Sequence, residues 1–320
     1  MTPVEKMAMR LLRRRNLQPP FDLDALVADY ASVEYLRFPH ALSADGITIG
    51  IGGKSKPQIL INSSTPKTRR KFTLAHELGH IIIPWHTGTI ISHTDCVNTN
   101  FEYFEYREME LEANQFAAEL LMPRDWIQKL NKECNSLAFL IRMVLNYTGV
   151  SRDAALIQIF KTINTPIVCA WVGDNGELKQ NYRTRTAPQT DSLCGKNLFE
   201  SKSFVTATSE ETFSLGDRIY KSWIFGKIEI IEVEPSAWRN ILAQILNETG
   251  KQELLSSINA ILPAKYSSNK DKSEQELCSL IMRAYDGRSK YDEIISHPLF
   301  PQYVMKRVKE LRKKEKSNNT

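Results

Sequence analysis

The spacing of apolar residues divides the first half of the chain into two short helices, a group of strands and several longer helices. Apolar steps of three and four predict helices at about 3–15 and 22–29. Runs rich in Ile, Val and Tyr, bounded by Gly, Pro, Ser and Asp, predict strands at 33–38, 46–51 and 58–62. The pattern therefore places a small sheet before the longer helices.

After residue 164 the pattern becomes strand-like and then helical. Two hairpins are predicted, the first from 166–172 and 178–183 and the second from 218–225 and 227–232. The first pair flanks the sequence Gly-Asp-Asn-Gly, which is a strong hairpin signal, and the second pair flanks Gly226. From residue 235 the pattern is helical, and we interpret the polar run at 267–272 as a linker.

Charge changes this picture only near the C-terminus. The net charge is +5, and residues 305–320 hold seven Lys or Arg against two Glu, which accounts for all of it. We interpret this stretch as a solvated, partly disordered tail, so direct nucleic-acid binding is not expected. No apolar run approaches the roughly 18 residues of a membrane span, and no apolar core follows the basic residues near the start. We therefore expect a cytoplasmic protein without a membrane partner.

The candidate chemistry begins with one short motif, His76-Glu77-Leu78-Gly79-His80. A helix is predicted around it, with Thr65 as N-cap and Pro66 at the first helical position. Residues four apart return to the same face of a helix about 6 Å along its axis, so His76 and His80 can bind one zinc ion. Glu77 would lie beside them as the general base that takes a proton from water.

A catalytic zinc needs three protein ligands and an open position, so a third ligand must come from elsewhere. His86 lies six residues after His80, but Ile83 and Pro84 occupy the stretch where the chain would have to turn back. It belongs to a predicted loop at 84–104, unusually long for a compact domain. Candidate donors to a tetrahedral intermediate lie in or next to this loop, and they are His93, Tyr103 and Tyr106.

Carboxylates of a helix predicted at 105–121 are the other candidates for the third ligand. At about 100° per residue, Glu110 lies about 75° from the centre of the apolar stripe, and Glu112 about 85° on the other side. Helical geometry therefore leaves both open. Asn114, one turn after Glu110, could orient a ligand through a hydrogen bond.

The two motifs together resemble the ImmA/IrrE family of metallo-endopeptidases. The resemblance rests on Phe-Thr-Leu-Ala-His-Glu-Leu-Gly-His at 72–80 and on the segment 110–123, which begins Glu-Leu-Glu-Ala-Asn, and it covers about residues 1–163. It implies that the glutamate three before the alanine is the third ligand, which is Glu110. It also implies a single zinc ion and a substrate that is often a helix-turn-helix transcriptional repressor, cut to start a stress or mobile-element response.

We therefore predict an α+β fold in three parts. These are a zincin-like zinc metallopeptidase domain at 1–163, a β-rich sensor or substrate-recognition segment at 164–235, and a helical C-terminal region with a basic tail at 236–320. The predicted activity is zinc-dependent hydrolysis of a peptide bond in a repressor, with Glu77 as catalytic base and His76, His80 and Glu110 as metal ligands. The alternative is a metal-bound regulatory protein that binds a transcription factor without cleaving it.

Overall fold

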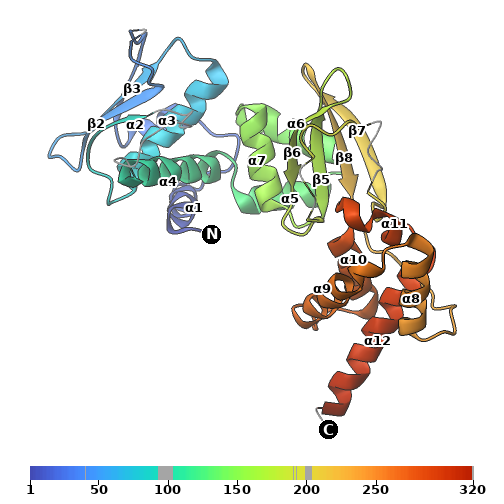
Figure 1. Cartoon of the computed structure of the whole chain (residues 1–320). Coiled ribbons are helices and arrows are strands. Elements are labelled where there is room, and N and C mark those ends of the chain that lie inside the picture. The colour runs from blue at the N-terminus through green and yellow to red at the C-terminus, as the bar shows by residue number, and fades with distance from the viewer. Residues whose placement is uncertain (40, 93–103, 190, 192, 199–203, 319–320) are drawn as a thin grey trace. The chain divides into compact units, whose positions relative to one another are not determined.

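The computed structural model describes residues 1–39, 41–92, 104–189, 191, 193–198 and 204–318 (Figure 1). The chain forms two compact units, Met1–Ile163 and Asn164–Thr320. The first contains both motifs singled out above. None of the described helices has the length and apolar character needed to span a membrane.

The first unit combines a four-stranded sheet with seven helices among its described residues. The strands are β1 (Ser32–Leu36), β2 (Gly46–Ile51), β3 (Gln58–Asn62) and β4 (Gly88–Ser92). The helices are α1 (Pro3–Arg15), α2 (Leu23–Ala28), α3 (Lys67–Ile82), α4 (Phe104–Leu121), α5 (Arg124–Glu133), α6 (Leu137–Thr148) and α7 (Arg152–Thr162). The prediction of an α+β fold with a small sheet is confirmed, whereas the zincin-like detail stays a prediction.

The sheet has the order β1-β3-β2-β4, with β1 parallel to β3 and the other neighbours antiparallel. β4 lies inside the segment predicted as a loop, so that prediction is wrong for Gly88–Ser92. The strand is short, and only Ile90 and Ser92 are buried on it while Ile91 is exposed. It is defined by its pairing with β2, which places Gly46 opposite Ser92. Because β2 is distant in the sequence, the local sequence pattern does not predict this pairing.

Helix α3 begins one residue later than predicted. Pro66 occupies the N-cap position without a side-chain capping hydrogen bond, and the Thr65 hydroxyl instead donates to the Asn62 carbonyl at 2.9 Å. The helix ends at Ile82, and the Ile83 backbone is already extended. Because Pro84 follows, the helix cannot continue.

Helices α3 and α4 pack tightly against each other (Figure 1). A Cβ atom added to Gly79 would lie 3.1 Å from the Phe116 ring and 3.4 Å from the Ala113 Cα, so only glycine fits here without a shift. Buried polar contacts then tie α4 to its neighbours. Glu119 accepts hydrogen bonds from the Arg124 backbone at 2.9 Å and from the Gln158 side chain at 3.2 Å.

The second unit begins with an antiparallel sheet of order β6-β5-β8-β7. Its strands are β5 (Ile167–Val172), β6 (Leu178–Arg183), β7 (Ser209–Leu215) and β8 (Arg218–Ile224). The first predicted hairpin, β5 with β6, is confirmed. The second is wrong, because β8 pairs with β7 through a turn at Gly216, whose φ of +62° suits glycine. The segment 227–232 is not a strand, and the Gln275 side chain bonds both the N–H and the carbonyl of Ile230.

Helices complete the second unit. They are α8 (Trp238–Thr249), the 3-10 helix η2 (Gln252–Leu254), α9 (Leu255–Ser267), α10 (Glu274–Tyr285), the 3-10 helix η3 (Ser289–Tyr291), α11 (Asp292–Ile295) and α12 (Phe300–Asn318). The predicted linker at 267–272 is a tight turn between α9 and α10. The predicted disordered tail is also wrong, because α12 buries Val304 and Val308 in the helical core and Lys306 pairs with Glu232 at 3.0 Å.

The packing of α3 on α4 predicts the effect of a larger side chain at Gly79. Gly79→Leu should lower the melting temperature and weaken metal binding, because overpacking forces the two helices apart and carries Glu110 away from the histidines. Thr68→Leu, on the exposed first turn of α3, is the matched control. Thermal unfolding and metal content measure both effects, and equal behaviour of the two variants would contradict the prediction.

Candidate metal centre

Helix α3 brings His76 and His80 onto one buried face. The two side chains are 1% and 0% exposed, and their Nε2 atoms lie 3.0 Å apart. This is the consequence of their spacing, because residues four apart share a face of the helix. Two imidazole nitrogens facing each other at this distance cannot both carry a proton, so they form a site that attracts a shared cation.

Helix α4 adds a carboxylate to this pair. Glu110 is buried, with Oε2 at 3.4 Å from His76 Nε2 and Oε1 at 3.2 Å from His80 Nε2. Neither Glu110 oxygen completes a hydrogen bond of normal geometry with any described residue. One ligand atom from each of the three residues lies within 4.8 Å of the others. Two imidazole nitrogens and one carboxylate oxygen, buried and otherwise without hydrogen-bond partners on that side, fit a divalent metal ion.

The charge state of these groups follows from their burial and their contacts. Burial alone would raise the pKa of Glu110, but the adjacent imidazoles of His76 and His80 lower it to about 2. Burial would lower the pKa of His76, but Glu110, Glu77 and Asn114 together raise that pKa above its ordinary value. Burial lowers the pKa of His80 to about 4. Glu110 is therefore a carboxylate and His80 a neutral imidazole near neutral pH, which are the forms that bind metal.

Asn114 fixes the orientation of His76, as the sequence suggested. Its Oδ1 lies 2.9 Å from His76 Nδ1. An amide oxygen only accepts, so His76 Nδ1 carries a proton, and Nε2 is the ring nitrogen that faces the shared site. Such a partner on the second ring nitrogen is the usual arrangement around a metal-binding histidine.

The other candidates for the third ligand, His86 and Glu112, lie outside the cluster of His76, His80 and Glu110. His86 Nδ1 is 2.8 Å from His80 Nδ1, and His86 Nε2 is 3.1 Å from Glu112 Oε2. Trp85 Nε1 also donates to Glu112 Oε2, at 2.6 Å. The consistent set of protons runs from His80 to His86 and from His86 to Glu112. Both candidates therefore support His80 instead of joining Glu110 in the cluster.

Glu77 lies beside the cluster on the same helix and contacts β2. It is fully buried, its Oε2 accepts a hydrogen bond from the Thr48 hydroxyl at 2.5 Å, and its Oε1 has no hydrogen-bond partner among the described residues. Burial raises the pKa of Glu77 to about 7. A carboxylate with this pKa exchanges a proton readily near neutrality, as a general base must.

Gly46 leaves the space that Glu77 occupies. A Cβ atom at Gly46 would lie 2.4 Å from Glu77 Oε1 and 2.7 Å from Thr73 Cγ2. Sequence reasoning missed both Gly46 and Thr48, because they precede the motif by about 30 residues and belong to another element. Of the candidate donors, Tyr106 bonds the Ile91 carbonyl of β4, while His93 and Tyr103 lie outside the described residues.

Comparison with known proteins places this site in a family. Residues 32–160 match the model of the IrrE N-terminal-like domain of peptidase family M78. This segment of the chain is similar to the ImmA/IrrE family. The matched segment contains α3, α4 and all the residues of the cluster, and peptidases of this family are metal-dependent.

Two proteins also show similarity to this chain. The "Uncharacterized immunity region protein 2" of Bacillus phage phi105 is 29% identical over 126 residues, which are 39% of this chain and 72% of the phage protein. A Mycobacterium tuberculosis transcriptional regulator of known structure is 13% identical, with a TM-score of 0.39, over 69% of this chain and 75% of its own. At that TM-score the second likeness supports no conclusion.

The contacts of Glu110, His86 and Glu112 predict how substitutions rank. Glu110→Ala should abolish stoichiometric metal binding, because it removes one of three donors. His86→Ala and Glu112→Ala should keep the metal with an affinity about 10- to 100-fold lower, since they remove only the support of His80. Elemental analysis and competition with a chelator measure both. Loss of metal from His86→Ala with retention in Glu110→Ala would make His86 the third ligand.

The close approach of Gly46 to Glu77 predicts a defect of a different kind. Gly46→Ala should displace the Glu77 carboxylate and reduce turnover strongly, while metal content stays near that of the unmodified chain, because the atoms nearest the added Cβ belong to Glu77 and Thr73. Gly50→Ala is not a matched control, since its φ is +81°. Ile49→Ala, exposed on the same strand, serves instead. Parallel loss of metal and activity would contradict this assignment.

Proposed function

We propose that the chain is a zinc-dependent endopeptidase that cleaves a protein substrate. The observation that carries the proposal is the buried cluster of His76, His80 and Glu110 with the Glu77 carboxylate beside it, inside an IrrE N-terminal-like domain. Two imidazoles and one carboxylate are a ligand set of catalytic zinc sites, and the adjacent glutamate supplies the base.

The metal would be held by His76 Nε2, His80 Nε2 and the Glu110 carboxylate. We favour zinc because the donors are nitrogen and oxygen atoms, three in number, as in zinc hydrolases. When bound, zinc would supply a Lewis acid that polarises the carbonyl of the scissile peptide and makes water more acidic. Asn114 and the His86–Glu112 pair would keep the two imidazoles in the orientation that the site needs.

Glu77 would carry out the proton transfers. Thr48 holds Oε2, so Oε1 is the oxygen available to accept a proton from the attacking water. A pKa of about 7 allows the same carboxyl to pass that proton to the leaving amine, because neither the protonated nor the ionised form is strongly favoured. Gly46 keeps the space around this oxygen open.

The substrate class is inferred from the family and from the phage relative. We propose that it is a helix-turn-helix repressor of a mobile element or stress response, since the phi105 protein bears the name of an immunity region. Residues 164–320 contain neither motif and would recognise the substrate or a signal. The alternative, a metal-bound regulator that does not cleave, is separated from this proposal by the experiment below.

Glu77→Gln should keep the metal and lose nearly all cleavage, because an amide of the same shape cannot accept the proton. Unmodified and variant protein would be incubated with a lysate of the host cell, and new protein N-termini would be compared by mass spectrometry. We expect termini that appear only with the unmodified chain and that map to a DNA-binding repressor.

Two controls define the outcome. Chelator-treated protein should resemble Glu77→Gln, and adding zinc back should restore cleavage only in the unmodified chain. Equal sets of termini with both proteins, together with a full equivalent of metal, would favour the non-cleaving regulator. Metal well below half an equivalent that added zinc cannot restore would remove the site itself.

A further inference from the structure

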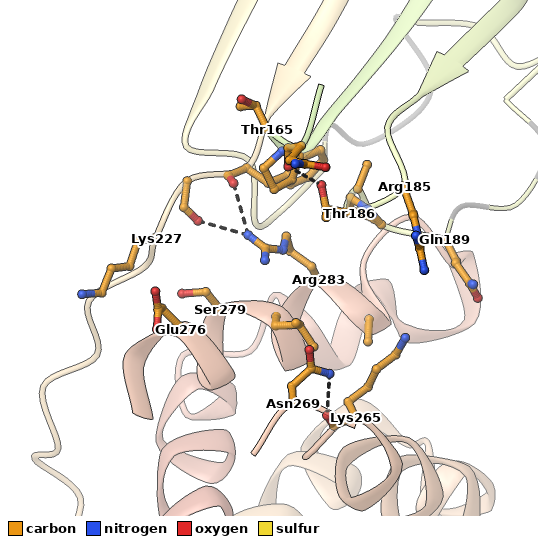
Figure 2. Close-up of a pocket in the computed structure, with 18 of the residues that line it drawn as sticks. Thr165, Arg185, Thr186, Gln189, Lys227, Lys265, Asn269, Glu276, Ser279 and Arg283 are labelled. Atoms are coloured by element: carbon orange, nitrogen blue, oxygen red, sulfur yellow. Dashed lines mark hydrogen bonds between the residues drawn. The ribbon is translucent and has the colours of Figure 1, made fainter. Parts of the chain in front are cut away.

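Residues 164–320 contain a cavity that takes no part in the proposed peptidase chemistry. It lies between the chain segments at the ends of β5, β6 and β8 and the helices α9 and α10 (Figure 2). Its volume is about 810 Å³. Cavities that hold small-molecule ligands commonly measure about 300–1,000 Å³, so this one has the size of a binding site.

The lining of the cavity is strongly basic. Its only carboxylate among the lining residues is that of Glu276, and its basic side chains are Arg185, Lys227, Lys265, Lys272, Arg283 and Arg288. Across the described residues, none of these six forms a salt bridge within 4.0 Å. Other lysines of the same unit are paired, as Lys270 is with Glu315 at 2.7 Å. Within the cavity lining, six basic side chains therefore face a single carboxylate.

Arg283 lies at the centre of the view in Figure 2. Its Nη1 donates to the Phe225 and Gly226 carbonyls at 3.2 and 3.4 Å, and its buried Nε has no hydrogen-bond partner among the described residues. Burial lowers the pKa of Arg283, and no carboxylate offsets it. A half-buried guanidinium that bonds only to carbonyl oxygens is costly unless an anion joins it.

Hydrogen bonds join the chain segments next to the cavity. The Asp286 carboxylate, just after α10, accepts hydrogen bonds from the backbone of Val205 at 3.3 Å and Thr206 at 2.8 Å. Arg288 donates to the Gln189 carbonyl and side chain at 3.3 and 3.1 Å. These contacts join the segment after α10 to the segments next to β6 and β7, so part of the cavity wall is held in place before any ligand arrives, which lowers the entropy cost of binding.

We propose that this cavity binds a small polyphosphorylated ligand of the nucleoside polyphosphate class. Guanidinium and ammonium groups are the preferred partners of phosphate oxygens, and several phosphates are needed to engage cations on opposite walls. Figure 2 places Lys227 and Arg185 on opposite flanks of Arg283, with Lys265 below. Apolar lining residues, among them Pro166, Pro188 and Leu280, leave room for an uncharged portion of the ligand.

Isothermal titration of the full, zinc-loaded chain with ATP and, separately, with sodium tripolyphosphate tests the proposal. At about 0.1 M salt, both probes should bind one per chain, with affinity that falls as salt is raised. Arg283→Gln should weaken both by about tenfold or more, since it removes charge-assisted hydrogen bonds. Lys265→Gln, on α9, changes the cavity lining at a second position, should weaken both as well, and guards against misfolding of the Arg283 variant.

Lys313→Gln removes one exposed charge of α12 outside the cavity and is the matched control. It should bind both probes within about twofold of the unmodified chain. If the probes instead extracted zinc from the chain, the measured heat would be the same in every variant and would not change on substitution of Arg283. No binding at about 1 mM probe, or equal affinities of all three variants, would overturn the proposal. So would tight binding of a short single-stranded oligonucleotide when neither probe binds.

Discussion

The close packing of α3 and α4 at Gly79 is the contact on which the candidate metal centre depends. His76 and His80 come from one helix and Glu110 from the other, so the cluster exists only when the helix axes approach closely. A side chain at residue 79 would meet the Phe116 ring and the α4 backbone. Each helix must therefore present a small or flat surface at the same level, and a change in either one alters the position of Glu110.

Burial gives the two carboxylates of the site opposite properties. Glu110 faces two imidazoles, which lower its pKa to about 2, whereas Glu77 faces β2, and burial raises its pKa to about 7. One is held ionised as a ligand must be, and the other is poised to gain and lose a proton. The difference arises from the element that each side chain contacts, since both residues are deeply buried.

Residues that act through local spacing could be predicted from the sequence, and those that act through tertiary contacts could not. His76, Glu77 and His80 lie within five residues, so helical periodicity alone places them together. Glu110 and Glu112 flank the apolar stripe of α4 at similar angles, so periodicity could not separate them. In the structure the two differ in their contacts, because Glu112 bonds to His86, which in turn bonds to His80 Nδ1, the ring nitrogen that faces away from Glu110. Gly46 and Thr48 reach the site through a sheet whose fourth strand gave no signal.

The errors in the second half have a common physical origin. Polar segments such as β7 and the end of α12 take their structure from partners that are distant in sequence, as Lys306 does from Glu232. The basic balance of the chain suggested a solvated tail because composition does not reveal which charges are paired. Nor does composition reveal that six basic side chains, from segments distant in the sequence, line one cavity in the described part of the second unit.

The two units thus present opposite electrostatic demands. The first unit buries two imidazoles and a carboxylate, which favour binding of a cation. The second unit has a cavity lined by basic side chains, which favour binding of an anion. Occupancy of the cavity would affect the metal centre only if the ligand binds one conformation of the chain more tightly than another, and the effect could not exceed the ratio of those affinities. By the same linkage, a substrate or metal that changed the affinity of the cavity would have its own affinity changed by an equal factor. The proposed binding in the second unit and the proposed catalysis in the first are therefore separate properties, and only a measured coupling would join them.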